Sequence, residues 1–314
     1  MDETSSERAR IALLAGPTPI QEMWRLRAAI GGGPRLLVKR DDAIPFGFGG
    51  NKVRKLEFML ADALATESDV VVTVGGLQSN HARATAAAAA KLGLGCVLIL
   101  NGAPPDHLTG NTLLDRLLGA EIEFIPSRAE RAAASEDVMA RLKRQGRRPF
   151  FVPLGASTPV GALGFVSAVG EMVDQGVIPD VIVHAGSSGG TQAGLLAGIA
   201  RHGLATRVLA VSADDPADSV AATVKRIVRG IEGMAGFDAP VEVDDTRVGE
   251  GYGIPTSASR AAQELVARTE ALFVDHTYTA KALGALIDYV RSGRFTPEET
   301  VLFWHTGGQV GLFA

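Results

Sequence analysis

The chain has 314 residues, of which 46% are hydrophobic, and it carries a formal net charge of −4. This length suits one large domain or two modest ones, and the lack of a basic excess argues against a nucleic-acid partner. The single cysteine, Cys96, excludes an internal disulfide framework. No apolar run reaches the length of a membrane span, and the acidic, polar residues 1–7 are unlike a signal peptide. We therefore expect a soluble cytoplasmic protein with neither a membrane nor a nucleic-acid partner.

Strand-like and helix-like runs alternate along almost the whole chain. Short, apolar, β-branched runs predict strands at Arg35–Lys39, Val70–Val74, Cys96–Leu100, Glu121–Ile125, Phe150–Val152, Val181–Val183, Val208–Val211 and Val301–Trp304. Other runs predict a helix that starts near Lys52 and helices at His81–Lys91, Leu113–Leu118, Val138–Leu142, Ala162–Val173, Gln192–Ala200, Ser259–Glu270 and Ala280–Val290. This alternation predicts an α/β fold with parallel sheets that helices cover on both faces.

Glycine clusters follow several of the predicted strands, at residues 75–76, 155, 186–190 and 307–308. In open parallel sheets, ligands bind beyond the carboxyl ends of the strands. The clusters therefore predict a ligand cleft at this edge.

The run Gly49-Gly50-Asn51-Lys52 places a lysine at the start of a predicted helix. The helix macrodipole favours anions at that end, so a cation there is unexpected. The chain has only seven lysines, and its arginines cannot form a Schiff base. We take Lys52 as a candidate for covalent chemistry; the alternative is a solvated lysine on a helix face.

A second motif, Gly-Ser-Ser-Gly-Gly-Thr at 186–191, leads from a predicted strand into a helix of small residues. This arrangement points backbone N–H groups at a phosphate. The lysine of a nucleotide P-loop is missing, and the glycines do not have the spacing of the dinucleotide motif. The motif favours a small phosphate ester without a nucleotide, and the alternative is a glycine-rich turn without a ligand.

Three further motifs carry hydroxyl and amide groups. Residues 78–81, Gln-Ser-Asn-His, open a predicted helix, where Ser79 or Asn80 could act solely as an N-cap. Tyr252 lies in the turn Tyr-Gly-Ile-Pro, and Thr277-Tyr278-Thr279 leads into a helix that a threonine could cap. The sequence His-Thr-Gly-Gly closes the last strand at 305–308.

The order of these motifs, together with Lys-Arg-Asp-Asp at 39–42, resembles that of fold-type II enzymes, which use pyridoxal 5'-phosphate (PLP). The branch it resembles contains D-cysteine desulfhydrase and aminocyclopropane-carboxylate deaminase, and the resemblance runs from about Pro17 to the C-terminus. It implies two parallel-sheet α/β domains, as in the tryptophan synthase β-subunit, with PLP in the cleft between them. We expect a large PLP-binding domain at 1–52 and 162–314, a small domain at 53–161, and a homodimer, which is common in the family.

The resemblance also implies catalytic roles. Lys52 looks like the lysine that forms a Schiff base with PLP and then acts as a base at the substrate α-carbon. Ser79 matches the residue that meets the substrate carboxylate and can join proton transfer. Tyr252 and Tyr278 match two tyrosines on the substrate side of the cofactor ring.

Other residues match the cofactor site. Asn80 corresponds to the residue beside the phenolic oxygen of PLP, and Lys55 to a cation near its phosphate. The residues that match the phosphate cup are Ser188, Gly189, Gly190 and Thr191. Thr279 and Thr306 stand where the deaminase branch has glutamate and leucine, close to the pyridine ring. PLP is the only cofactor that the resemblance implies, and no metal is expected.

Both of these threonines resemble the desulfhydrase pattern, so the resemblance implies β-elimination from D-cysteine to pyruvate, ammonia and hydrogen sulfide. The match is incomplete, because Thr256 after the Tyr-Gly-Ile-Pro turn and the pair Ala280-Lys281 also look like L-cysteate sulfo-lyase, which would release sulfite. Cysteate therefore stays open as the substrate, and deamination of aminocyclopropane-carboxylate is less expected. Two functions of other classes are also considered. The intact Lys52 and Ser79 argue against a non-catalytic phosphate-binding protein. A nucleotide-dependent dehydrogenase is opposed by the missing glycine fingerprint.

Overall fold

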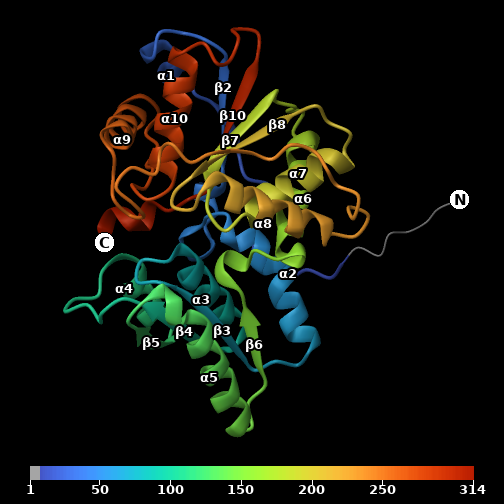
Figure 1. Cartoon of the computed structure of the whole chain (residues 1–314), viewed down its shortest axis with the longest axis vertical. Coiled ribbons are helices and arrows are strands. Elements are labelled where there is room, and N and C mark those ends of the chain that lie inside the picture. The colour runs from blue at the N-terminus through green and yellow to red at the C-terminus, as the bar shows by residue number, and fades with distance from the viewer. Residues whose placement is uncertain (1–7) are drawn as a thin grey trace, which may run out of the picture.

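The computed structural model describes residues 8–314, which form two sheets placed one above the other (Figure 1). The larger sheet has the strand order β1-β2-β10-β7-β8-β9, and the smaller has the order β5-β4-β3-β6. The predicted α/β architecture is confirmed, except that β1 runs antiparallel to β2. Residues 1–7, on which the comparison with a signal peptide depends, lie outside the described range.

Every strand and helix that the sequence predicts is present. The strands are β1 (Ile20–Glu22), β2 (Arg35–Arg40), β3 (Val70–Gly76), β4 (Gly95–Asn101), β5 (Glu121–Ile125), β6 (Pro149–Val152), β7 (Val181–Gly186), β8 (Arg207–Ser212), β9 (Glu242–Asp244) and β10 (Thr300–His305). The helices are α1 (Trp24–Ala29), α2 (Lys52–Ala65), α3 (Asn80–Leu92), α4 (Gly110–Leu117), α5 (Arg131–Arg144), α6 (Pro159–Asp174), α7 (Gly190–Arg201), α8 (Ala217–Arg229), α9 (Ser257–Glu270) and α10 (Thr279–Arg291). Within residues 8–314, no helix is both long and apolar enough to cross a membrane.

Two α-helices, α1 and α8, and two strands, β1 and β9, were not predicted from the sequence. Helix α8 buries Val220, Val224 and Ile227, and this spacing places all three on one helix face. Its signal was therefore present in the sequence. The strands β1 and β9 have three residues each, too few for a period of two to be recognised.

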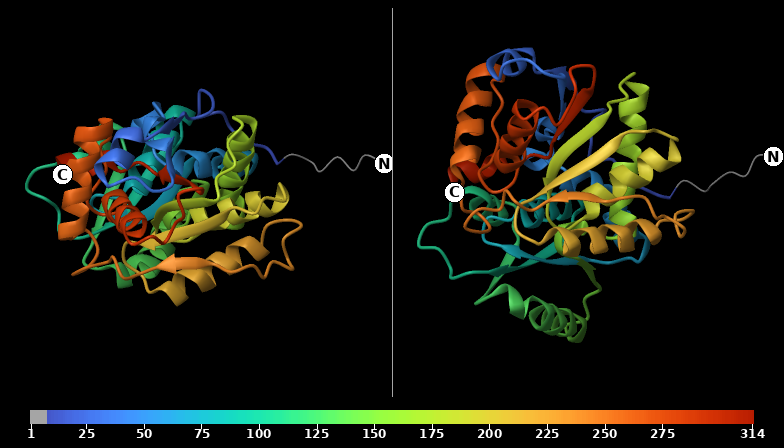
Figure 2. Two further views of the ribbon diagram at one scale, coloured as in Figure 1. Left: turned by 90° about the horizontal axis from the view of Figure 1, so that it is seen from above. Right: turned by 45° about the horizontal axis from the view of Figure 1, so that its top comes forward.

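Each sheet separates two hydrophobic cores. In β7, Val181 and Val183 pack towards α9 and α10, whereas Ile182 packs towards α6 and α7; Figure 2 shows these helix pairs on opposite sides of the strands. In β3, Val71 faces α2 and α3, and Val72 faces α5. This alternation follows from the opposite directions of successive side chains in a strand, and it fixes the orientation of every loop that leaves the sheets.

Helix α2 links the two sheets, because it packs both on α6 beside the larger sheet and on α3 beside the smaller. The strands of the larger sheet come from residues 20–40 and 181–305, and those of the smaller sheet from 70–152. The domain limits at 52/53 and 161/162 stay a prediction.

A buried ion cluster holds α2 against the larger sheet. Arg54 is 3% exposed, and its guanidinium lies 2.8 Å from the carboxylates of both Asp41 and Glu171. Asp41, which is fully buried, also accepts a hydrogen bond of 2.8 Å from the indole N–H of Trp304. Lys39 donates to Glu171 at 2.5 Å. The cluster joins α2, α6, β2 and β10, so it sets where the first turn of α2 lies.

Replacing Arg54 by methionine should destabilise the protein strongly, because Asp41 and Glu171 would be left without their partner. We expect a loss of about 3–5 kcal/mol in the free energy of unfolding, measured by urea denaturation. A matched control is Arg35→Met, whose partner Glu22 is 40% exposed and whose loss should cost under about 1 kcal/mol. Equal losses in the two variants would contradict a special role for the cluster.

The same cluster predicts an acid-labile contribution to stability. Burial alone would raise the pKa of Glu171, but the hydrogen bonds and charges of Arg54 and Lys39 outweigh it and lower this pKa to about 2. Because the folded pKa is depressed, the stabilisation is complete above the ordinary value of 4.5 and is lost as the pH falls towards 2. Urea denaturation between pH 6 and pH 2 should show this loss. In Glu171→Gln, the free energy of unfolding should depend less on pH over this range.

Candidate active site

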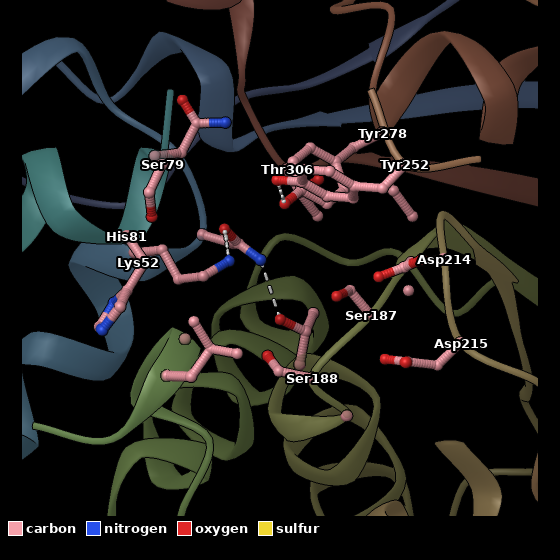
Figure 3. Close-up of a pocket in the computed structure, with 18 of the residues that line it drawn as sticks. Lys52, Ser79, His81, Ser187, Ser188, Asp214, Asp215, Tyr252, Tyr278 and Thr306 are labelled. Carbon is pink, nitrogen blue, oxygen red and sulfur yellow. Dashed lines mark hydrogen bonds between the residues drawn. The ribbon is translucent and has the colours of Figure 1, made fainter. Parts of the chain in front are cut away.

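A cavity of about 400 Å³ opens where the carboxyl ends of strands from both sheets meet. The cavity wall includes most of the residues that the sequence predicts: Lys52, Ser79, Asn80, Ser188, Gly189, Thr191, Tyr252, Tyr278 and Thr306. In Figure 3, Lys52 and Ser79 point into it from one side, the two tyrosines and Thr306 from a second, and Ser188 from a third. The structure thus brings together motifs that lie more than 200 residues apart in the chain.

Lys52 is the first residue of α2, as predicted. Its amine donates to the side-chain oxygen of Asn51 at 2.9 Å. Burial and the positive charge of Arg83 lower the pKa of Lys52 to about 8, although the carboxylate of Asp275 opposes the shift. A substantial part of this amine is therefore neutral in mildly alkaline solution, as a nucleophile or base requires.

Ser79 is the N-cap of α3, and its hydroxyl accepts a hydrogen bond of 3.1 Å from the N–H of Ala82. The capping role considered above is therefore confirmed, and the same residue lines the cavity. The neighbouring Asn80 accepts from the amide of Asn111 at 3.1 Å. The short helix-opening turn thus presents both side chains at the carboxyl end of β3.

The loop between β7 and α7 forms a wall of hydroxyl and backbone donors. Gly189 adopts φ +78°, a conformation that favours glycine. The hydroxyl of Ser188 lies 2.7 Å from that of Ser157, which also accepts from the N–H of Gly190 at 3.3 Å. Thr191 accepts from the amide of Asn51 at 2.9 Å, so the start of α7 is tied to the start of α2. A helix N-terminus that opens into a cavity is suited to a phosphate.

Lys55, Gly190 and Thr279 lie behind the cavity wall. The amine of Lys55 donates to the carbonyl of Gly155 at 3.2 Å, and burial with the nearby charge of Lys52 holds the pKa of Lys55 well below its ordinary value. A Cβ at Gly190 would lie 3.0 Å from the Lys55 amine, so this amine lies against the loop. The hydroxyl of Thr279 donates to Asp275 at 2.6 Å instead of facing the cavity. Of the two threonines predicted near the pyridine ring, only Thr306 lines the wall.

The two predicted tyrosines form a pair. Their hydroxyl oxygens lie 2.5 Å apart, and the rings meet edge to face with centroids separated by 5.7 Å. Burial raises the pKa of Tyr252 and raises that of Tyr278 well above its ordinary value. Both hydroxyls are thus protonated at neutral pH and able to donate.

Asp275, and not Thr277, caps helix α10. Its carboxylate accepts from the backbone N–H groups of Thr277, Tyr278 and Thr279 at distances of 2.9 to 3.0 Å. The expectation of a threonine cap was wrong, because a carboxylate placed before the helix satisfies more of its free N–H groups. Asp275 therefore fixes the position of Tyr278.

Several residues of the cavity wall had no predicted role: Asn51 and His81, which lie within the predicted motifs, and Arg128, Arg131, His184, Asp214 and Asp215. The two aspartates follow β8 at its carboxyl end. Because ligands bind beyond the carboxyl ends of parallel strands, their place in the sequence could have predicted them. Arg131 is held by the side-chain oxygen of Asn101, and Arg128 pairs with Asp214 across the cavity mouth at 2.7 Å. Nothing in the local sequence distinguishes these arginines from surface residues.

A family model described as pyridoxal-phosphate dependent enzyme matches residues 11–307. The chain belongs to this family. It is 37% identical to D-cysteine desulfhydrase of Klebsiella pneumoniae over 317 residues, which cover 97% of this chain and 95% of that protein. It is 39% identical over 323 residues to a Pyrococcus abyssi protein provisionally named 1-aminocyclopropane-1-carboxylate deaminase, with 100% and 96% of the two chains covered.

Solved structures agree with the fold. The crystal structure of a homologue of ACC deaminase superposes with a TM-score of 0.91 at 36% identity, covering 98% of this chain and 94% of that one. A fungal L-serine ammonia-lyase from Rhizomucor miehei has a TM-score of 0.69 at 16% identity, with 98% and 96% of the chains covered. The predicted fold-type II architecture and the dependence on PLP are therefore confirmed.

The donor set of the cavity fits PLP. The serine and threonine hydroxyls and the helix N-terminus of the loop after β7 would hold the phosphate, with the buried amine of Lys55 behind them. Lys52, whose amine has a lowered pKa, would react with the aldehyde of the cofactor. The individual roles of these residues stay predictions.

The attachment of the cofactor to Lys52 can be tested directly. We expect the purified protein to absorb visible light, and borohydride reduction should fix the cofactor to Lys52 in peptide mapping. Lys52→Ala should lose the visible band, whereas the surface variant Lys91→Ala should keep it. An adduct on Lys55 or Lys281 would refute the assignment.

The loop after β7 should control how tightly PLP is held. Thr191→Val keeps the shape but removes the hydroxyl, and Gly189→Val forces a branched residue into a conformation with positive φ. We expect Thr191→Val to weaken retention about five- to tenfold, as one lost hydrogen bond implies, and Gly189→Val to weaken it further; equilibrium dialysis measures both. Thr206→Val, which removes a buried hydroxyl bonded to Pro179, is the control. Unchanged affinity in both loop variants would place the phosphate elsewhere.

Proposed function

We propose that this PLP-dependent lyase eliminates a sulfur substituent from the β-carbon of a small amino acid, with D-cysteine as the leading substrate. The products would be pyruvate, ammonia and hydrogen sulfide. The observation that carries the proposal is the pair of protonated hydroxyls of Tyr252 and Tyr278, which faces Lys52 and Ser79 across the cavity (Figure 3). The identity to D-cysteine desulfhydrases over nearly the full length supports it.

Lys52 is suited to proton transfer at the substrate α-carbon. PLP, when bound, withdraws electrons from that carbon. The lowered pKa of Lys52, about 8, leaves part of the amine unprotonated at neutral to mildly alkaline pH, so it can accept the proton. Asn51, 2.9 Å away, orients the amine.

Ser79 would bind the substrate carboxylate, and Asn80 would orient the ring of the cofactor. Both lie at the opening of α3, where the helix end favours a negative charge. Fixing the carboxylate at this point would direct the α-hydrogen towards Lys52 and the β-substituent towards the tyrosine pair.

The tyrosine pair would complete the elimination. When the bond between the β-carbon and sulfur breaks, the sulfur leaves with the bonding electrons and takes up a proton from a hydroxyl. The pKa of each hydroxyl lies above the ordinary tyrosine value, so a donor is present throughout the neutral range. Water then hydrolyses the unsaturated amino-acid product to pyruvate and ammonia.

A second candidate substrate is L-cysteate, with release of sulfite. The guanidinium of Arg131 lines the cavity and is bonded to the neutral side chain of Asn101, which leaves its charge for an anionic substituent such as a sulfonate. Ring opening of aminocyclopropane-carboxylate is less favoured, because Thr306 in the wall and Thr279 behind it replace the leucine and glutamate of that branch. We also propose that the enzyme acts in the cytoplasm as a homodimer on small amino acids, without a membrane or nucleic-acid partner.

Product analysis with the tyrosine variants tests the proposed reaction. Wild-type protein should release sulfide and pyruvate from D-cysteine faster than it turns over L-cysteine, cysteate or aminocyclopropane-carboxylate. Tyr278→Phe should lower kcat about a hundredfold or more, as loss of a general acid implies. Tyr289→Phe removes a buried tyrosine hydroxyl that bonds Asp244 outside the cavity and should keep kcat. Faster turnover of cysteate than of D-cysteine would indicate a sulfite-releasing enzyme. Full activity of Tyr278→Phe would show that the hydroxyl of Tyr278 is not the proton donor.

A further inference from the structure

The turn that precedes Lys52 is held by a buried arginine from another helix. Arg83 lies in the first turn of α3 and is 1% exposed. Its guanidinium donates from Nη1 to the carbonyl of Gly49 at 3.2 Å and also to the carbonyl of Gly47. Gly47 and Gly49 have positive φ, 52° and 67°, so the turn depends on conformations that favour glycine. Arg83 thus fixes the backbone that leads into α2.

The opposite side of the guanidinium is held by Asn111 of α4. Arg83 donates from Nε to the side-chain oxygen of Asn111 at 3.0 Å. The Asn111 amide in turn donates to the carbonyl of Gln78 at 3.0 Å and to the side chain of Asn80 at 3.1 Å. Asn111 is fully buried, so water does not compete for these bonds. A continuous path of hydrogen bonds therefore joins the turn before Lys52 to Asn80, and Lys52 and Asn80 line the cavity from two different helices, α2 and α3.

The charge of Arg83 has no hydrogen-bonded carboxylate among residues 8–314. Asp115, one turn after Asn111, is fully buried, and neither of its carboxylate oxygens has a partner within that range. Burial raises the pKa of Asp115 to about 7, against the opposing effect of Arg83. Near neutral pH the guanidinium is therefore only partly neutralised, and its charge reaches Lys52.

We infer that Arg83 is a positioning residue that holds Lys52 and Asn80 at a fixed separation in the cavity wall. It does so through the carbonyls of the Lys52 turn on one side and through Asn111 on the other. A guanidinium is suited to this because its planar fork donates in several directions at once, which a lysine amine does not reproduce. The inference rests on the proposed role of Lys52.

Arg83 would also act on the proton affinity of Lys52. Other ionisable groups face Lys52 from the surrounding elements, and they remain in place when Arg83 is changed: Lys55, His81, His184 and Asp275. A change in the Lys52 pKa on replacing Arg83 therefore reports the arginine itself.

The test compares two replacements of Arg83 with a control in the same helix. Arg83→Met removes both the charge and the planar set of N–H donors. Arg83→Lys keeps a charge but loses the planar arrangement of donors. Thr85→Val removes a buried hydroxyl that bonds only the carbonyl of His81. One readout is the pKa of Lys52 in the full-length apoprotein, from competitive acetylation followed by mass spectrometry. The other is kcat and KM of the holoenzyme, with circular dichroism as the check of folding.

In Arg83→Met the pKa of Lys52 should rise from about 8 towards its ordinary 10.5, and kcat should fall. In Arg83→Lys this pKa should stay near 8 while kcat falls about ten- to a hundredfold, as a misplaced reacting group implies. Thr85→Val should change neither. If Arg83→Met does not fold, Asn111→Ser, which removes the amide donor to Asn80, should lower kcat with the Lys52 pKa unchanged.

Folded Arg83 variants with the wild-type Lys52 pKa and wild-type kcat would overturn the inference and leave Arg83 a packing residue, which would alter only the melting temperature. The acetylation measurement needs no substrate. An error in the proposed reaction would appear as inactivity of the wild-type enzyme on every sulfur substrate, whereas an error about Arg83 would appear in the acetylation data.

Discussion

The position of helix α2 is set by the buried ion pair between Arg54 and Asp41. Removing two charges from water costs several kcal/mol for each ion, and only a well-aligned pair offsets this cost. Helix α2 is therefore stable only where its Arg54 reaches Asp41 and Glu171 together. The backbone carbonyl of Asp41 also accepts from the N–H of Gly50 at 2.9 Å. The cluster therefore fixes the turn that places Lys52, two residues before Arg54, at the cavity.

Around that lysine, the structure gathers basic groups whose charged forms are disfavoured by burial. Lys52 and Lys55 have pKa values lowered by burial, and burial also lowers that of Arg83 to about 10. His184 beneath the same wall has its pKa lowered by burial to about 4, so it stays neutral. A protein interior holds such a set of charges at a cost in stability. A dianionic phosphate bound at the loop after β7 would offset part of this cost.

The cavity depends on contacts between segments that are distant in the chain. Asn51 bonds Thr191 across the starts of α2 and α7, and Arg128 bonds Asp214 across the mouth. The hydrogen bond between Asn51 and Thr191 is buried. The side chain of Arg128 is 67% exposed, so its ion pair with Asp214 contributes little to stability. The contact between the starts of α2 and α7 therefore contributes more to the shape of the site than the surface pair does.

The sequence by itself determined the alternation of strands and helices, because β-branched apolar runs and helical periodicity are local properties that survive without knowledge of the fold. It also determined the glycine-rich loops at the strand ends and the start of α2 at Lys52, since these depend on backbone conformation and helix ends. Only the tertiary structure decided that Asp275 caps α10, that Thr279 turns away from the cavity, and that Arg131 enters it. Those outcomes depend on which distant segment lies opposite each side chain, and local periodicity contains no information about such neighbours.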